Sequence, residues 1–238
     1  GTGQEYVYEF QVPNRAGTYW YHPHPHRRTG PQVYYGLAGL FLVADDEEEA
    51  VGLPEGEFDL PLVIQDRTFD NANQLVYLTG RGDQLSGFLG NQVLVNGTVN
   101  YTLSAATRVY RLRLLNGSNS RIYRLAWSDG RPLTVVATDG GLLEQPVQRS
   151  SVLLAPGERI ELWADFSDSA SGTEIKLVSL PTPEIQSFMG GMMGGGLGIA
   201  NGAPLTVLSV QIDRREEEDL TLPARLSTIE RYQVRQAV

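Results

Sequence analysis

The sequence predicts an all-β fold in which two sheets pack face to face. Short segments rich in β-branched and aromatic residues recur along the chain, and turn-forming residues separate them. The chain has 238 residues, of which 41% are hydrophobic, enough for a sizeable core, and its 26 glycines and 13 prolines fit many turns. No pattern indicates a helix longer than one or two turns. These features together are typical of a β-sandwich.

The expected strands fall into two groups. The first group is 6–12, 18–24 and 37–44, and the last of these is a continuous apolar run expected to be buried. Three strands are too few for a closed sandwich. A second series begins near residue 58, at the spacing of a sandwich, and its strands are expected at 60–65, 76–78, 92–95, 106–115, 122–127, 133–137, 148–154, 159–165, 174–179 and 204–211.

Charge and composition exclude several classes of function. The net charge of −9 argues against nucleic-acid binding, because phosphate recognition needs a basic surface. The acidic residues are concentrated at 45–49 and 216–219, and such runs are usually solvated linkers. No run of 18 apolar residues is present, so no membrane span is expected. With no cysteine, the chain forms neither a disulfide nor the Cys–His₂ site of a type 1 copper.

All three histidines lie within five positions and alternate with two prolines. The aromatic residues before them favour a strand, and alternate residues of a strand share a face. Imidazole is the commonest transition-metal ligand, and strand neighbours two apart are about 6.5 Å apart, which suits two adjacent ions better than one. A lone His-x-His pair is weak evidence, since most bind nothing. The residues expected to point one way are Trp20, His22, His24 and His26.

A longer pattern surrounds the histidines. It consists of a Trp-x-His-x-His motif, a glutamine and a Gly-Leu-x-Gly motif that precedes an apolar strand, and it resembles the end of the first cupredoxin domain of laccase-type multicopper oxidases. The matching positions are Trp20, His22, His24, Gln32, Gly36, Leu37 and Gly39. Further segments resemble the second domain of that family, at 60–67, 93–97, 110–118, 138–141 and 153–159.

The resemblance implies a Greek-key β-sandwich of cupredoxin type. The expected organisation is the last strands of a first domain (1–44), an acidic linker (45–57), a complete second domain (58–213) and a linker towards a third domain (214–238). The second domain is expected to be copper-free, because it contains no histidine. The resemblance also implies a periplasmic or secreted protein, although no signal peptide is present in this chain.

The resemblance implies a trinuclear copper cluster that reduces dioxygen to water. His22 and His24 match the pair that binds the two type 3 coppers, one imidazole to each. His26 is then expected to orient a neighbouring ligand or to be exposed, and Trp20 to pack beside the cluster. Electrons would come from phenolic or aromatic substrates, or from metal ions. The remaining ligands would come from the rest of the polypeptide, so we expect this chain alone to be inactive.

Three alternatives remain open. One is a non-catalytic, cupredoxin-like structural or assembly protein, against which the presence of both His22 and His24 argues. Another is a two-domain laccase or nitrite-reductase-like protein, against which the missing cysteine speaks. The third is a copper-resistance cuprous oxidase, since thioethers are soft ligands suited to Cu(I). The segment that would bind it contains all the methionines among glycines, which also fits a simple tether; they are Met189, Met192 and Met193.

Overall fold

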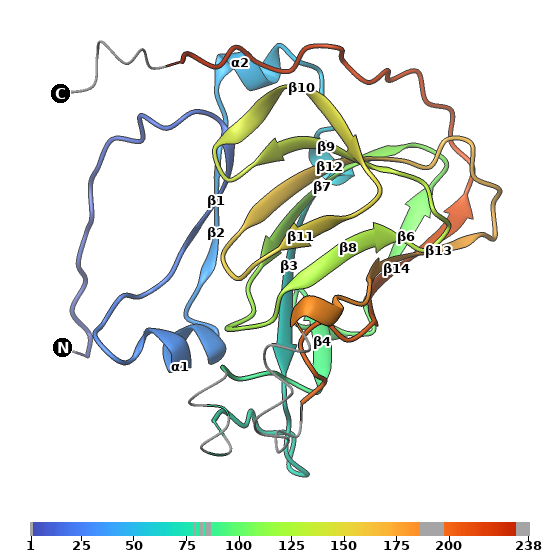
Figure 1. Cartoon of the computed structure of the whole chain (residues 1–238). Helices are drawn as coiled ribbons and strands as arrows, with labels where there is room; N and C mark the ends of the chain where they lie inside the picture. The colour runs from blue at the N-terminus through green and yellow to red at the C-terminus, as the bar shows by residue number, and fades with distance from the viewer. Residues whose placement is uncertain (1, 79, 81–82, 84–86, 186–197, 232–238) are drawn as a thin grey trace.

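The computed structural model describes residues 2–78, 80, 83, 87–185 and 198–231, and these form a β-sandwich with a two-stranded sheet beside it (Figure 1). The prediction of an all-β fold is confirmed. The helical elements of the described chain are all short: α1 (Thr29–Tyr34), α2 (Asp46–Glu49) and the 3₁₀ turn η1 (Gly56–Phe58). No helix in this part of the chain has the length and apolar character that a membrane crossing requires.

The larger sheet has seven strands in the order β10-β9-β12-β7-β3-β4-β5. Its members in chain order are β3 (Asp59–Arg67), β4 (Gln92–Val95), β5 (Thr98–Val99), β7 (Val109–Asn116), β9 (Leu133–Thr138), β10 (Gly141–Arg149) and β12 (Arg159–Asp165). All neighbours are antiparallel except β3 and β7, which are parallel.

The facing sheet has five strands in the order β11-β8-β13-β14-β6. They are β6 (Thr102–Ala106), β8 (Tyr123–Trp127), β11 (Val152–Leu154), β13 (Glu174–Ser179) and β14 (Leu205–Arg214). The pair β14–β6 is parallel and the others are antiparallel. The small sheet pairs β1 (Gly17–Tyr21) with β2 (Gly39–Val43) in antiparallel register.

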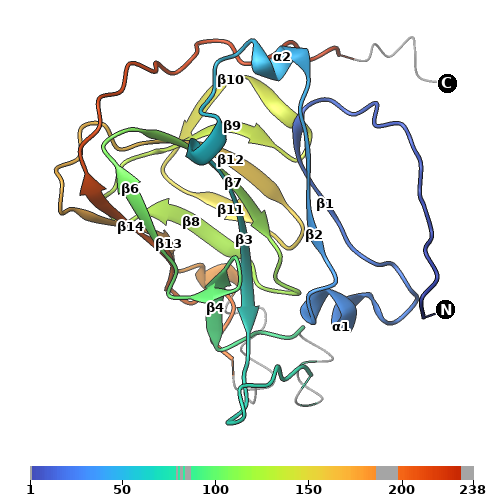
Figure 2. The same ribbon diagram turned by 180° about the vertical axis from the view of Figure 1, so that it is seen from behind.

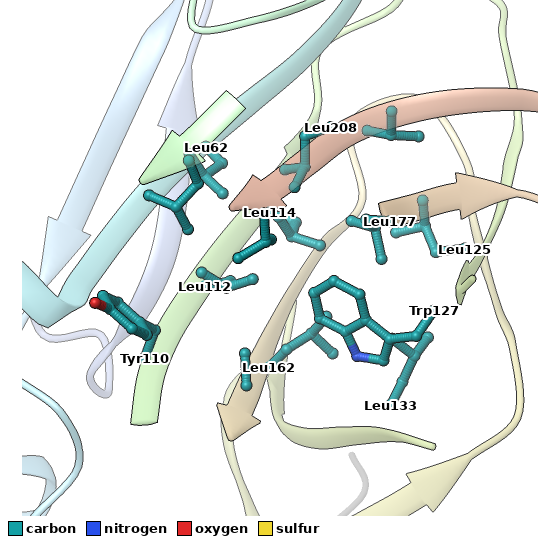
Figure 3. Close-up of a cluster of buried hydrophobic side chains, with 14 of the residues drawn as sticks. Leu62, Tyr110, Leu112, Leu114, Leu125, Trp127, Leu133, Leu162, Leu177 and Leu208 are labelled. Carbon is teal, nitrogen blue, oxygen red and sulfur yellow. The ribbon is translucent and has the colours of Figure 1, made fainter. Parts of the chain in front are cut away.

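The main core lies between the two large sheets (Figure 3). Strand β7 shows how the sequence builds it, because alternate residues of a strand face opposite sides. Tyr110, Leu112 and Leu114 belong to this core, together with Leu162 of the adjacent strand β12 and Trp127 of β8 in the facing sheet. All of these side chains are buried. Packing between the sheets therefore fixes the inner face of β7.

The outer face of β7 is buried as well, although it carries two arginines. Arg111 Nε donates to Glu161 Oε2 (2.8 Å), and Arg113 Nε donates to Asp59 Oδ1 (2.7 Å). Both guanidinium groups also pair with Glu48 of α2. Burial of a charge is costly unless it is paired, so this cluster of two arginines and three acids holds α2 against the sheet.

The same cluster reaches the small sheet. Thr18 Oγ1 of β1 donates to Glu161 Oε1 at 2.7 Å, and Thr18 is fully buried. Beside it, the carboxylate of Asp45 accepts from the backbone N–H groups of Ala16 (2.8 Å) and Glu48 (2.9 Å), which joins the start of β1 to the N-terminus of α2. These hydrogen bonds lower the pKa of Asp45. The small sheet is thus tied to the sandwich by polar contacts.

The chain after β14 runs back over the sandwich as far as α2 (Figures 1 and 2). Leu226 is buried there, and its N–H donates to Glu144 O at 3.0 Å. Thr228 N donates to Glu47 Oε1 of α2 at 2.7 Å. The residues that pack with Leu226 on this outer face form a second apolar cluster, made of Leu53, Val109, Val136, Ala137, Leu142 and Trp163.

The prediction that the acidic runs are solvated is wrong at Glu48, Glu216 and Glu218. Glu48 is buried between two arginines. Glu216 and Glu218 pair with Arg108, at 3.1 Å in each case. The arginines that face these acids are Arg111 and Arg113 of β7 and Arg108 in the turn before β7, and pairing with them holds the acids against the sandwich.

Several strand predictions are also wrong. Residues 6–12 form no strand and are exposed, because no described strand lies beside them to complete a hydrogen-bond ladder. The strand expected at 18–24 ends at Tyr21. The run at 37–44 gives β2, but Phe41 and Leu42 are exposed. Residues 76–78 form no strand.

Two other expected strands prove to be composite. The segment 106–115 spans the end of β6 and most of β7, and 148–154 spans the end of β10 and all of β11. In each case the chain crosses from one sheet to the other within two residues, so hydrophobicity alone does not reveal the break.

The core predicts a clear difference between two leucine substitutions. Leu114→Ala should lower the free energy of unfolding by about 2–5 kcal/mol, because it leaves a cavity in the packed core. Leu153→Ala, at a position that is 54% exposed, should cost less than about 1 kcal/mol. Urea denaturation followed by circular dichroism measures both, and equal losses would contradict the assignment of the core.

The buried ion cluster predicts a second difference. Glu48→Ala should lower the free energy of unfolding by about 1–3 kcal/mol, because buried guanidinium N–H groups of Arg111 and Arg113 lose an acceptor. Glu49→Ala, which removes the same charge from an exposed neighbour, is the matched control and should have little effect. The same denaturation experiment decides this, and a Glu48 variant as stable as the control would rule out the structural role.

Candidate metal site

Residues 22–26, which we call the histidine segment, leave the small sheet at the end of β1. Pro23 and Pro25 carry no N–H group, so the segment does not continue the ladder beyond Tyr21. His22 is half-buried, whereas His24 is exposed. The rings nevertheless follow one another in a row, with centroid separations of 4.3 Å from Trp20 to His22 and 6.1 Å from His22 to His24. His26 is exposed at the end of the segment.

One contact fixes which nitrogen of His22 is available to a metal. Nδ1 of His22 lies 3.0 Å from the carbonyl oxygen of Pro23. A carbonyl only accepts hydrogen bonds, so Nδ1 must carry the proton. The lone pair of neutral His22 is then on Nε2, which is the arrangement usual for metal-binding histidines. The local backbone thus prepares His22 as an Nε2 ligand.

The beginning of the segment is held by the turn between β11 and β12. A Cβ atom at Gly157 would lie 3.1 Å from Cζ2 of Trp20, and Gly157 has a φ of +82°. Glycine is therefore required on both steric and conformational grounds. Arg159, two residues on, donates from Nε to the carbonyl oxygen of Thr18 at 2.9 Å. The Trp20 indole consequently rests on a fixed part of the sandwich.

The other end of the segment is held by helix α1. Asn119 Nδ2 donates to Gly30 O at 2.8 Å. The hydroxyl of Tyr34 donates to Val76 O (2.7 Å) and accepts from Thr68 N (2.9 Å). Tyr34 is only 1% exposed, and burial raises its pKa. The histidines therefore lie between two anchored points.

An aromatic cluster surrounds the Tyr34 anchor. The centroid of the Tyr34 ring lies 4.5 Å from that of Tyr77 and 5.0 Å from that of Phe88. The guanidinium carbon of Arg67 lies 4.6 Å from the centroid of the Tyr34 ring. Burial also raises the pKa of Tyr77. These side chains and Asn119 were not identified from the sequence. No short motif marks them, because they lie far along the chain from residues 22–26.

The described residues contain no group of three or more His, Cys, Asp or Glu side chains arranged to hold a metal. The segment itself contains three imidazoles, those of His22, His24 and His26. The methionines named above, Met189, Met192 and Met193, lie outside the described residues.

Known proteins resemble this chain in sequence and in structure. A family model described as multicopper oxidase matches residues 1–48. A multicopper oxidase mco of Staphylococcus epidermidis is 40% identical over 176 residues, which are 74% of this chain and 38% of that protein. The crystal structure of the McoA multicopper oxidase from Aquifex aeolicus superposes over 96% of this chain with a TM-score of 0.82 and 39% identity. The chain belongs to the multicopper oxidase family.

Not every relative in the multicopper oxidase family is named as an oxidase. A cell division protein FtsP of Sodalis glossinidius is 44% identical over 170 residues, which are 71% of this chain and 35% of that protein. The chain covers 48% of McoA. It therefore spans less than half the length of each of these three relatives.

The Tyr34 anchor can be tested directly. Tyr34→Phe should lower the free energy of unfolding at pH 7 by about 1–3 kcal/mol, because the buried N–H of Thr68 loses its acceptor. Tyr35→Phe, at an exposed neighbour, is the control and should be near neutral.

The contribution of Tyr34 to the free energy of unfolding should also depend on pH. The raised pKa of Tyr34 means that the folded protein keeps this proton where the unfolded chain begins to lose it, above about pH 10. The stabilisation is therefore complete below that pH and is lost as the pH rises further. The difference between wild type and Tyr34→Phe should shrink in alkali, and a difference that grew there would contradict the burial of this hydroxyl.

Proposed function

We propose that this chain supplies two type 3 copper ligands, His22 and His24, to a laccase-like multicopper oxidase. The observation that carries the proposal is the preparation of His22, whose Nδ1 proton is engaged by Pro23 O and whose Nε2 is left for a metal. His24 follows at a ring separation of 6.1 Å. Bound copper would supply the one-electron steps by which dioxygen is reduced to water.

The residues around the histidines would prepare them for this role. The Trp20 ring covers one side of His22 and shields it from water. Pro23 and Pro25 restrict the backbone between the imidazoles, which lowers the entropy lost on metal binding. His24 and His26 are exposed, so further ligands can approach them. His26 would orient such a ligand or remain in solvent.

The rest of the site must come from elsewhere in the protein that carries this chain. Two imidazoles are too few for three coppers, and a chain without cysteine offers no thiolate for a type 1 site. Under this proposal the partners are the remaining parts of the same polypeptide. The reducing substrate would be a phenolic or other aromatic compound, and the location would be the periplasm or the outside of the cell.

A second candidate is a non-catalytic protein of the same fold. It is favoured by the relatives named cell division protein FtsP, one of which is 44% identical to this chain. A cuprous oxidase remains a variant of the first candidate, supported by the three methionines at 189–193. Copper content of the whole protein separates the two main candidates, because a structural protein has no need of the type 3 pair.

The ligand assignment predicts distinct effects of single histidine substitutions. In the whole protein, His22→Ala or His24→Ala should remove type 3 copper and reduce oxygen consumption by more than about 100-fold. Loss of a residue that only orients a metal ligand already costs about 10–100-fold in activity, and loss of the ligand itself should cost at least as much. The blue absorbance of a type 1 site should persist. His26→Ala separates the two roles of His26: activity should be unchanged if this side chain lies in solvent and should fall about 10–100-fold if it orients a ligand.

Copper content by atomic absorption, oxygen uptake and the visible spectrum measure these effects. If the His22→Ala/His24→Ala double variant still consumed oxygen at the wild-type rate, the assignment would be wrong. If the wild-type protein reconstituted with copper bound none, the non-catalytic candidate would replace it.

A further inference from the structure

A cavity lies at one open edge of the sandwich, between strands β10 and β11. Its volume is about 740 Å³, within the range of small-molecule sites. The apolar side chains that line it are Val135, Leu143, Val147, Val152, Leu153 and Ile160. We call it the edge cavity.

The topology explains why this edge of the sandwich is open. Strand β10 is the last strand of the seven-stranded sheet, and β11 is the last strand of the five-stranded sheet. The chain crosses from one to the other between Arg149 and Val152, and the register of β10 shifts between Leu142 and Val147. No described strand follows on either side, so Leu153 remains 54% exposed.

Two arginines, Arg124 and Arg149, line the edge cavity, and they differ from three buried arginines of the sandwich. Arg111, Arg113 and Arg121 are buried and paired with carboxylates. In the described structure, neither Arg124 nor Arg149 lies within ion-pair distance of a carboxylate.

The contacts of these arginines orient them without neutralising them. Arg124 Nε donates to Ser151 Oγ at 3.1 Å, and Ser151 also lines the edge cavity. Arg149 Nη1 donates to Gln148 O at 2.9 Å. Glu184 is the one carboxylate in the lining, so the edge cavity has two positive charges and one negative charge. Arginine pairs favourably with carboxylates through two parallel hydrogen bonds.

We propose that the edge cavity binds a small amphipathic carboxylate, with its apolar body against Val147 and Ile160 and its carboxylate paired with Arg124 and Arg149. The apolar lining selects the chain or ring of such a molecule, and the guanidinium groups select its charge. This site uses no residue of the histidine segment, and it requires no copper.

Three probes of one length and different charge test this proposal. Octanoate, octan-1-ol and octylamine share the same alkyl chain, so differences in affinity report the head group alone. Octanoate should bind with a Kd on the order of 1 mM or tighter, as expected for a ligand of about ten heavy atoms. Octan-1-ol should bind about ten-fold more weakly, in line with the loss of one charged hydrogen-bond pair. Octylamine should bind most weakly.

Variants locate the binding within the chain. Arg124→Gln combined with Arg149→Gln should reduce octanoate affinity about ten-fold, to the level of octan-1-ol, and leave octan-1-ol unchanged. Arg215→Gln removes a positive charge from an exposed position outside the edge cavity and is the matched control. Leu153→Asp places a carboxylate at the position that pairs across strands with Arg124, so it should weaken octanoate and favour octylamine.

Isothermal titration calorimetry gives these affinities, and circular dichroism confirms that each variant is folded. Loss confined to octanoate in the double arginine variant would support the proposal. No binding of octanoate, equal binding of octylamine, or an equal loss in Arg215→Gln would overturn it. Because no probe contains copper and no readout depends on oxidation, failure here would leave the histidine assignment untouched.

Discussion

The arrangement of the whole chain depends on two arginines that face away from the main core. Arg111 and Arg113 occupy the outer face of β7, a strand buried along its whole length. Left alone in that position, each would cost several kcal/mol in lost hydration. The structure meets this cost with Asp59 and Glu161 from the adjacent strands and Glu48 from α2. Formally the cluster has three negative and two positive charges, so the acids outnumber the arginines.

This cluster has a consequence for the histidines. Thr18 donates to Glu161, so β1 is placed by the same carboxylate that pairs with Arg111. The position of β1 in turn puts Trp20 against Gly157 and directs the chain into the histidine segment. The position of His22 therefore rests on a polar contact between sheets, because neither apolar cluster of the described sandwich includes a residue of the small sheet.

The sequence predicts well where local pattern and tertiary environment agree. The predicted bounds 92–95, 159–165 and 174–179 coincide with β4, β12 and β13, whose alternation or apolar runs match their burial. Prediction fails where burial depends on a distant partner. Glu48 looks like part of a solvated run until the two arginines of β7 are placed beside it. Residues 6–12 alternate as a strand should, yet alternation alone supplies no neighbour for its backbone.

The candidate site shows the same division. The histidine pair and Trp20 were visible in the sequence because their spacing is local. Asn119 and Tyr34, which fix the far end of the segment, were not visible because they act through contacts with residues distant in the chain. Anchoring at both ends, with prolines between, limits how far the imidazoles of His22 and His24 can move. The conformational entropy of this segment is therefore lost when the protein folds and not when metal binds. This favours binding of a metal whose other ligands belong to a separate part of the protein. In the proposed oxidase, this rigid half-site would let the remaining ligands close around copper without first ordering this segment.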